Sequence, residues 1–362
     1  MTIFEFRRMI WMVVGNPLGC GSRRSCLPAH LIVLVIALLG AGCSSGEAFV
    51  EEQATATTGY ELKPVINLAV NDWTASAINV EIAGQLIERY LGYPVVGVRA
   101  DDTTDMYQSL VEGDLDAVLE VWPSTVTDRD QRFFDSGKVT SLGELGSIGK
   151  VGWFVPSYMV EENPSLATWE GFDDPVVASQ LASPSTGGKG RLLGTDPSYL
   201  QFDEQIISNL GLPLVVEFSG SEELTRAELE RSVAAGRPIL AYWWTPTATV
   251  ADLDLVSVAL PPVTDDCLAS AASEDGGVAC DYPEDRLVKV ASPGLETKAP
   301  EIHDFLSQFL LTTDDQSELL VAVENDGLSI QAVAEQWIAK NEDRWRTWLE
   351  PSSVDDNDDS DG

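Results

Sequence analysis

The chain has 362 residues, of which 58 are acidic and 22 are lysine or arginine, so its formal net charge is −36. This charge excludes nucleic acid as a partner, because affinity for nucleic acid depends on Lys and Arg side chains that neutralise phosphates. The two histidines are His30 and His303. With so few imidazole ligands, and with His30 in the N-terminal segment, a metal site is not expected.

The N-terminal segment has the pattern of an export signal. Arg23 and Arg24 precede the apolar run 31–39, and the small residues 40–42 then lead to Cys43. This pattern is typical of a signal peptide, and the apolar run is too short to remain as a membrane span. Its end resembles a bacterial lipobox, so we expect Cys43 to carry a lipid anchor. A simple secreted protein is the alternative.

Removal of this predicted signal peptide, residues 1–42, leaves Cys267 and Cys280 besides Cys43. Two cysteines in an oxidising compartment predict a disulfide, with two free thiols as the alternative. Residues 44–58 are mostly small and acidic, so we expect a flexible tether over residues 43–63. Residues 350–362 are expected to form a disordered acidic tail.

Apolar periodicity alternates between strands and helices in the first half of the chain. Short β-prone runs bounded by turn formers predict strands, and apolar residues three and four positions apart predict helices. Gly92 is expected to end the first helix. The β-α-β-α-β order predicts a parallel sheet. The expected elements are strand 66–70, helix 75–91, strand 94–99, a helix around Met106, Leu110 and Val111, and strand 116–121.

The alternation continues in the second half, after residues 145–155 cross into a second unit. Trp337, Trp345 and Trp348 are expected to pack the closing helices against the first unit. The predicted elements are helix 203–210, strand 214–218, helix 222–235, strands 239–243 and 287–291, and helices 301–311, 316–325 and 330–349. The predicted α/β domain division is lobe 1 at 64–150, lobe 2 at 151–287, and a return to lobe 1 at 288–349.

Three predicted strands end on tryptophan. Trp73, Trp122 and the pair Trp243-Trp244 each follow an apolar run. In open α/β sheets, ligands bind beyond the carboxyl ends of the strands. Several aromatic faces that meet at one point can bind a quaternary ammonium ion. The alternative is that each tryptophan is a core residue that caps its strand.

Six motifs together carry a family resemblance. The chain resembles the substrate-binding proteins of ABC importers for glycine betaine, proline betaine and choline, over nearly all of residues 64–349. The motifs are GYPV at Gly92–Val95, EGDLD at Glu112–Asp116, VWPST at Val121–Thr125, GWFVPSY at Gly152–Tyr158, DPSY at Asp196–Tyr199 and YWWTP at Tyr242–Pro246.

The resemblance implies a type II periplasmic-binding-protein fold, an α/β architecture with two mixed or parallel sheets in two lobes. The lobes would close on a ligand in the cleft by a hinge motion. It further implies a monomer without cofactor or enzymatic activity. Such a protein delivers its ligand to a membrane permease that a separate ATPase energises.

The resemblance also implies a set of site residues. Aromatic residues of the matching motifs are the expected cage walls: Trp73, Trp122, Tyr199 and Trp244, with Trp153 as a further candidate whose direction the sequence leaves open. In an alternating strand Tyr242 and Trp244 face one side and Trp243 the other, so only one side of this run can line the cleft.

The other end of the ligand is less defined. Some betaine binders carry a histidine where Val126 stands, so hydroxyl groups and backbone amides would have to bind a carboxylate; the candidates are Ser124, Thr125, Leu200 and Gln201. Choline binders use an acid where Ala75 stands, and Asp72 is a possible replacement. Glycine betaine is therefore favoured over choline, with carnitine or another methylated amine as alternatives.

Two contrasting functions are an anchored hydrolase and a ligand-sensing partner of a membrane receptor. Apart from Gly42–Gly46 at the predicted lipobox, the sequence has no Gly-x-Ser-x-Gly pattern that could form a nucleophile elbow. Residues 185–190 lack the leading glycine and the closing Ser or Thr of a phosphate loop, so we expect a surface loop there. A sensor would share the fold and the cleft. The favoured function is a lipid-anchored, extracytoplasmic binding component of an importer.

Overall fold

The computed structural model describes residues 62–350, except for 101–102, 200 and 271–275. The predicted signal peptide, Cys43, nearly all of the tether and the acidic tail after residue 350 lie outside the described residues. Within the described ranges, no helix is both long enough and apolar enough to cross a membrane.

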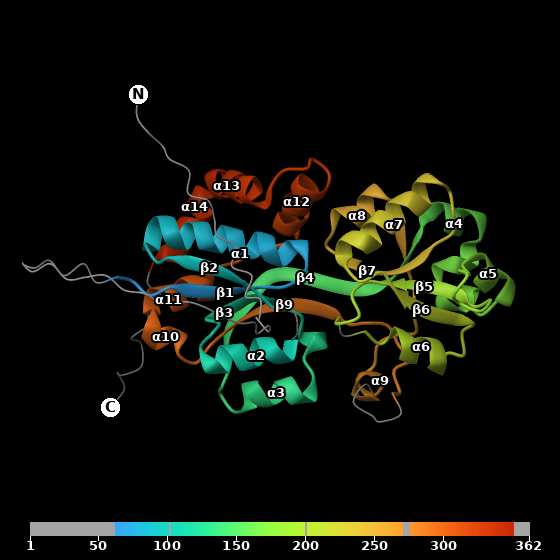
Figure 1. Ribbon diagram of the computed structural model, residues 1–362, viewed down its shortest axis with the longest axis horizontal. Coiled ribbons are helices and arrows are strands. Elements are labelled where there is room, and N and C mark those ends of the chain that lie inside the picture. The colour runs from blue at the N-terminus through green and yellow to red at the C-terminus, as the bar shows by residue number, and fades with distance from the viewer. Residues whose placement is uncertain (1–61, 101–102, 200, 271–275, 351–362) are drawn as a thin grey trace, which may run out of the picture. The chain divides into compact units, whose positions relative to one another are not determined.

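The strands form one hydrogen-bonded network in the order β2-β1-β3-β9-β4-β7-β5-β6, with β8 paired to β4 (Figure 1). The pairs β1–β2, β1–β3, β5–β6 and β5–β7 are parallel. The strands are β1 Ile66–Val70, β2 Val95–Arg99, β3 Ala117–Val121, β4 Thr140–Pro156, β5 Gly190–Gly194, β6 Leu214–Phe218, β7 Leu240–Thr245, β8 Leu255–Val258 and β9 Glu284–Ala291.

Two strands connect the parallel groups. β4 has 17 residues; its first part pairs with β9, and its last part pairs with β7 and β8, all antiparallel. β9 in turn pairs with β3. The two groups of parallel strands are present as expected, but they are joined in one network instead of forming two separate sheets. The reason is the length of β4, which serves both groups.

Helices flank both groups of strands, and β1 to β3 are separated by helices as the sequence predicts (Figure 1). The predicted helix 75–91 consists of α1 followed by a π-helical turn at Ile87–Leu91, and Gly92 ends it with φ 71°. The helices are α1 Thr74–Leu86, α2 Thr103–Glu112, α3 Asp128–Asp135, α4 Ser157–Glu162, α5 Pro175–Gln180, α6 Asp203–Asn209, α7 Glu222–Ala234, α8 Ala248–Asp252, α9 Asp265–Ala269, α10 Leu295–Lys298, α11 Pro300–Gln308, α12 Thr313–Glu324, α13 Ile330–Lys340 and α14 Glu342–Trp345.

The closing helices return to the first group of strands, as expected. α12 and α13 lie against α1 (Figure 1), and the Gln316 side chain donates to Asn79 Oδ1 at 3.1 Å. The predicted helix 330–349 is interrupted after Lys340, and α14 and a short 3₁₀ turn complete it. Trp337, Trp345 and Trp348 are buried there, in agreement with the packing role that their positions predict.

Strand β5 was not anticipated, because glycines stand at both of its ends. A Cβ atom on Gly190 would lie 2.6 Å from Leu214 Cδ2, and one on Gly194 would lie 2.7 Å from Phe218 Cδ1. Both glycines therefore allow β6 to pack closely beside β5. In the sequence the same glycines indicate a loop, and only the neighbouring strand explains them.

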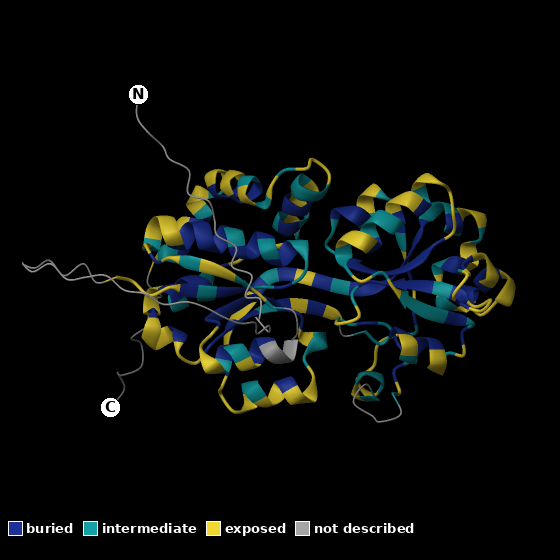
Figure 2. Cartoon of the chain, viewed as in Figure 1, coloured by how far each residue is buried: buried dark blue, intermediate teal, exposed yellow. Residues whose placement is uncertain are grey.

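Strands β1, β3, β5 and β7 are largely buried (Figure 2). The indoles of Trp153 and Trp243 are completely buried. Cys267 and Cys280 form a disulfide, which confirms the predicted pairing. The predicted lobe boundaries at residues 150 and 287 each fall inside a continuous strand, β4 and β9 respectively. The division into lobes stays a prediction.

Candidate functional site

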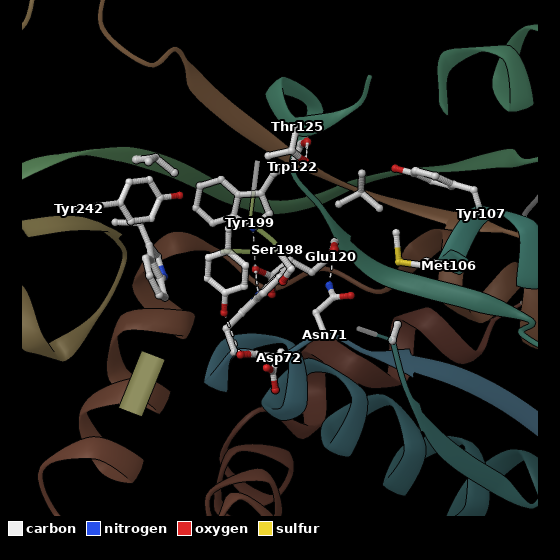
Figure 3. A pocket seen from close by; sticks show the side chains of 15 residues that line it. Asn71, Asp72, Met106, Tyr107, Glu120, Trp122, Thr125, Ser198, Tyr199 and Tyr242 are labelled. Atoms are coloured by element: carbon white, nitrogen blue, oxygen red, sulfur yellow. Dashed lines mark hydrogen bonds between the residues drawn. The ribbon is translucent and has the colours of Figure 1, made fainter. Parts of the chain in front are cut away.

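A pocket lies where β1, β3 and β7 end, between the two groups of strands (Figure 3). Its lining comes from chain segments that are far apart in sequence. The lining residues are Asn71, Asp72, Trp73, Ala100, Met106, Tyr107, Glu120, Val121, Trp122, Thr125, Val151, Ser198, Tyr199, Tyr242 and Trp244. The strand-end tryptophans thus meet at one site, as the order of strands predicts.

Aromatic rings line one side of this pocket edge to face. The ring centroids of Trp73 and Tyr199 are 5.8 Å apart at 89°. Those of Tyr199 and Trp244 are 6.2 Å apart at 72°. Tyr242 lies beside Trp244 with a centroid distance of 6.4 Å. Trp122 completes the aromatic lining, so rings from both groups of strands surround one volume.

Glu120 holds two of these rings. Its Oε1 accepts hydrogen bonds from Trp73 Nε1 at 2.7 Å and from Trp122 Nε1 at 3.0 Å. Its Oε2 accepts from Asn79 Nδ2 at 2.8 Å. One carboxyl group therefore fixes the indoles of two separate segments, and it leaves the ring faces available for a ligand.

Burial raises the pKa of Glu120 to about 7, and the hydrogen bonds from Trp122, Trp73 and Asn79 act against this rise. The side chain also lines the pocket. Near neutral pH the carboxyl group can therefore carry a negative charge beside a bound cation, or a proton beside a bound acceptor.

Sequence reasoning did not select Glu120. The signal was a single acid at position 120 in a run of otherwise apolar residues, Ala117–Val121, all five of which are buried. Acids are almost never buried in a strand unless they are paired or hydrogen-bonded. Asn71, which donates to the Glu120 carbonyl oxygen at 2.8 Å, is a second polar lining residue that the sequence did not single out.

Five of the nine predicted ligand-binding residues line the pocket: Trp73, Trp122, Thr125, Tyr199 and Trp244. Tyr242 lines it on the same side as Trp244, as strand alternation predicts, whereas Trp243 stacks behind Trp244 with centroids 4.5 Å apart.

Three other predicted residues lie outside the described lining, and Leu200 is not among the described residues. Trp153 is completely buried, and its Nε1 donates to Asp203 at 2.7 Å. The Ser124 amide and hydroxyl both bond to Asp285. The Gln201 side chain donates to the Asp196 carbonyl oxygen, whereas the donor that the sequence suggests at this position is the backbone amide.

Contacts between distant segments hold the pocket walls together. The Tyr199 hydroxyl donates to the Asp72 carbonyl oxygen at 2.9 Å. The Glu222 carboxyl group, at the start of α7, accepts from the Thr74 amide at the start of α1 at 3.0 Å. Asp72 is itself paired with Arg99. Hydrogen bonds therefore connect the two groups of strands at the N-terminal end of α1.

Burial raises the pKa of Glu222 to about 7, while the bond from the Thr74 amide opposes the rise and the charge of Glu324 adds to it. Glu324 is paired with Arg226 at 3.3 Å. Among the described residues, no group of three or more His, Cys, Asp or Glu side chains is arranged to hold a metal ion.

The chain matches known proteins over most of its length. Residues 64–340 match the model of the substrate-binding domain of the ABC-type glycine betaine transport system, OpuAC. A relative named trimethylamine N-oxide-binding protein, from Pelagibacter ubique (strain HTCC1062), is 26% identical over 291 residues, which are 78% of this chain and 90% of the relative.

Two solved structures share the fold. Lactococcal OpuAC in its closed conformation with glycine betaine has a TM-score of 0.62 at 18% identity, over 80% of this chain and 100% of that chain. A choline-binding protein of an ABC transporter, with choline, has a TM-score of 0.63 at 18% identity, over 79% and 91%. The expected two-lobed type II periplasmic-binding-protein fold is thereby confirmed.

Proposed function

Because the chain belongs to the family of substrate-binding domains of ABC-type glycine betaine transport systems, we propose that its pocket binds a compact methylated amine oxide, trimethylamine N-oxide. Membership of this family makes the protein the quaternary-ammonium-binding component of an ABC importer, and not an enzyme. The choice of ligand within that class is the proposal.

One observation carries the proposal: aromatic rings and a buried carboxyl group line the pocket together. Among its described lining residues there is no Lys, Arg or His, whereas Asp72 and Glu120 are both present. Aromatic faces and a carboxylate attract a cation that cannot donate hydrogen bonds. A trimethylated nitrogen fits this environment.

The same lining disfavours a carboxylate on the ligand. The sequence alone favours glycine betaine, but the carboxylate of glycine betaine accepts several hydrogen bonds. The Ser124 amide and hydroxyl, which were expected donors, both bond to Asp285, and the Glu120 carboxyl group lies in the pocket as a competing acid. An N-oxide has a single oxygen on the nitrogen itself and needs fewer donors. The name of the Pelagibacter ubique relative supports the same choice.

Glycine betaine is the second candidate, because the family model that matches residues 64–340 is that of glycine betaine transport systems. Choline and carnitine carry a hydroxyl group that could donate to Asp72 or Glu120. They remain alternatives within the same class.

Isothermal titration calorimetry on the exported protein tests the proposal. Trimethylamine N-oxide, glycine betaine, choline and carnitine would each be titrated at pH 7. We expect the lowest dissociation constant for trimethylamine N-oxide. Tighter binding of glycine betaine would reverse the order of the two candidates, and binding of a sugar or an amino acid alone would refute the proposal.

We further propose that Cys43 is lipid-modified and anchors the protein outside the cytoplasm, close to its permease. Tethering raises the effective concentration of a binding protein at its membrane partner. Mass spectrometry of the mature N-terminus should find a multiply acylated cysteine, because one chain gives only marginal anchorage. Cys43→Ser should release or misprocess the protein. If this protein bound a membrane receptor and not a permease, its role would be that of a ligand sensor.

A further inference from the structure

The Tyr242 side chain brings a hydroxyl group to the aromatic side of the pocket. It is only 4% exposed, and it lines the pocket. Its hydroxyl group has no hydrogen-bond partner among the described residues, and Figure 3 shows it directed toward the pocket side on which Trp122 lies. The hydroxyl oxygen is not among the fully buried polar atoms without a partner, so it can be reached from the pocket and can donate a hydrogen bond to a ligand there.

The other hydroxyl groups around the aromatic rings are already committed. Thr125 donates to the Trp122 carbonyl oxygen at 2.8 Å. Ser198 donates to Asp196 at 2.7 Å. Tyr199 donates to the Asp72 carbonyl oxygen at 2.9 Å. The indole N–H groups of the cage that are within reach of Glu120 are bound to it. Among the described lining residues, the hydroxyl groups of Tyr242 and Tyr107 have no hydrogen-bond partner, and Tyr242 is the one that packs beside a cage ring, that of Trp244.

Packing fixes the direction of the Tyr242 ring. Its centroid lies 6.1 Å from that of Tyr282, at 79°, and the Tyr282 hydroxyl is held by Asp203 at 2.7 Å. Burial raises the pKa of Tyr242 well above its ordinary value, and the charges of Asp203, Tyr199 and Asp285 add to this rise. The hydroxyl thus keeps its proton over the physiological pH range and can act as a donor.

We propose that Tyr242 is the specificity residue that donates a hydrogen bond to the oxygen atom of the bound methylated amine. It thereby separates ligands that carry an acceptor oxygen from plain tetraalkylammonium ions, which the aromatic faces alone would bind equally well. This inference rests on the proposed function, since it assigns the donor within that same site.

The substitution Tyr242→Phe tests the inference, because it removes the hydroxyl and keeps the ring. Calorimetry would compare trimethylamine N-oxide with tetramethylammonium, which has the same cationic methyl groups but no oxygen. We expect the substitution to weaken binding of trimethylamine N-oxide about tenfold and to change binding of tetramethylammonium less than about twofold.

Two matched variants separate selectivity from stability. Tyr107→Phe removes the other unpartnered lining hydroxyl, on the opposite side of the pocket beside Met106 (Figure 3), and tests it as the rival donor; the ratio of the two affinities should change less than in Tyr242→Phe. Tyr282→Phe removes a committed hydroxyl behind Tyr242 and should lower the melting temperature without changing that ratio. Thermal melts of all variants would report the folded fraction.

The outcomes distinguish the two proposals. Equal losses for both ligands in Tyr242→Phe, or no loss for either, would overturn the role of Tyr242 and leave the proposed function intact, as would a selective loss in Tyr107→Phe alone. A wild-type protein that binds neither ligand would overturn the proposed function, and the inference with it.

Discussion

Two regions of this protein are rich in tryptophan, and they use it differently. In the C-terminal region, Trp337 and Trp348 stack with centroids 6.0 Å apart, and the Arg344 guanidinium lies 5.6 Å and 5.8 Å from their rings. The pocket rings, within the described part of the chain, have no such cation from the protein. The C-terminal cluster carries its own cation, whereas the pocket leaves that place to a ligand.

The carboxyl group behind each cluster differs in the same way. Asp315 accepts from Trp337 Nε1 at 3.2 Å and is paired with Arg344 at 2.8 Å. Glu120 accepts from two indoles and an amide but has no basic partner among the described residues. The charge of Asp315 is therefore neutralised within the protein, whereas the charge of ionised Glu120 is left for a bound cation.

The largest expected effect comes from tryptophan substitutions in the two regions. Trp122→Ala should weaken ligand binding by about 2–4 kcal/mol, as expected for an aromatic hot spot in a desolvated pocket. Trp244→Ala should do the same. Trp348→Ala should instead lower the free energy of unfolding by about 3–5 kcal/mol through the cavity that it leaves. Calorimetry and thermal melts measure both quantities, and an unchanged affinity in folded Trp122→Ala would show that the site is misplaced.

The two carboxyl groups should give opposite dependence of stability on pH. The pKa of Glu120 rises from 4.5 to about 7 on folding, so the native state holds a proton that the unfolded state has lost. The free energy of unfolding of the ligand-free protein should therefore fall as pH rises from 4.5 to 7. Glu120→Gln should reduce this decline by about 1–3 kcal/mol. The free energy of unfolding would be measured by urea titration at several pH values, and an identical pH dependence in the variant would contradict the raised pKa of Glu120.

Asp315 provides the control in the C-terminal cluster. Burial acts to raise the pKa of Asp315, but hydrogen bonds from Thr312, Arg344 and Trp337 outweigh it and hold the pKa below its ordinary value of 3.8. The stability that Asp315 contributes is present above pH 3.8 and is lost as pH falls through the lowered pKa. Asp315→Asn should reduce stability at pH 7 and leave the slope between pH 4.5 and 7 unchanged.

Binding of a pure cation should also depend on Glu120. As pH falls from 8 to 6, Glu120 takes up a proton and its negative charge is lost beside the pocket, so tetramethylammonium affinity should drop about fivefold. Calorimetry at the two pH values measures the drop. Glu120→Gln should bind the cation equally at both, and a wild-type affinity independent of pH would assign the binding to the rings alone.

The smallest effect is expected from the cation of the C-terminal cluster. Arg344→Met keeps most of the side-chain length but removes the guanidinium from the faces of Trp337 and Trp348. The loss of stability should be about 1–2 kcal/mol, from the cation–π contacts and the ion pair to Asp315. Thermal melts give the loss, and ligand affinity should not change; a change would mean that the two regions are coupled.

Much of this fold was predictable because it depends on local patterns. The strands at 66–70 and 214–218 and the end of the first long helix at Gly92 follow from apolar runs and turn formers that act within a few residues. Strand β5 was missed, since its two glycines are required only by the neighbouring β6. The continuity of β4 was likewise set by pairing between distant strands.

The sequence by itself determined that tryptophans end the strands and that Cys267 and Cys280 follow the predicted signal peptide as a pair. Only the tertiary structure decided which polar groups of the pocket have a hydrogen-bond partner within the protein and which do not. Indole N–H groups from two other segments bond to Glu120, whereas no described residue bonds to the Tyr242 hydroxyl. The Trp153 indole bonds to Asp203 and is buried away from the pocket. Hydrogen-bond partners are chosen across space, and spacing along the chain does not reveal them.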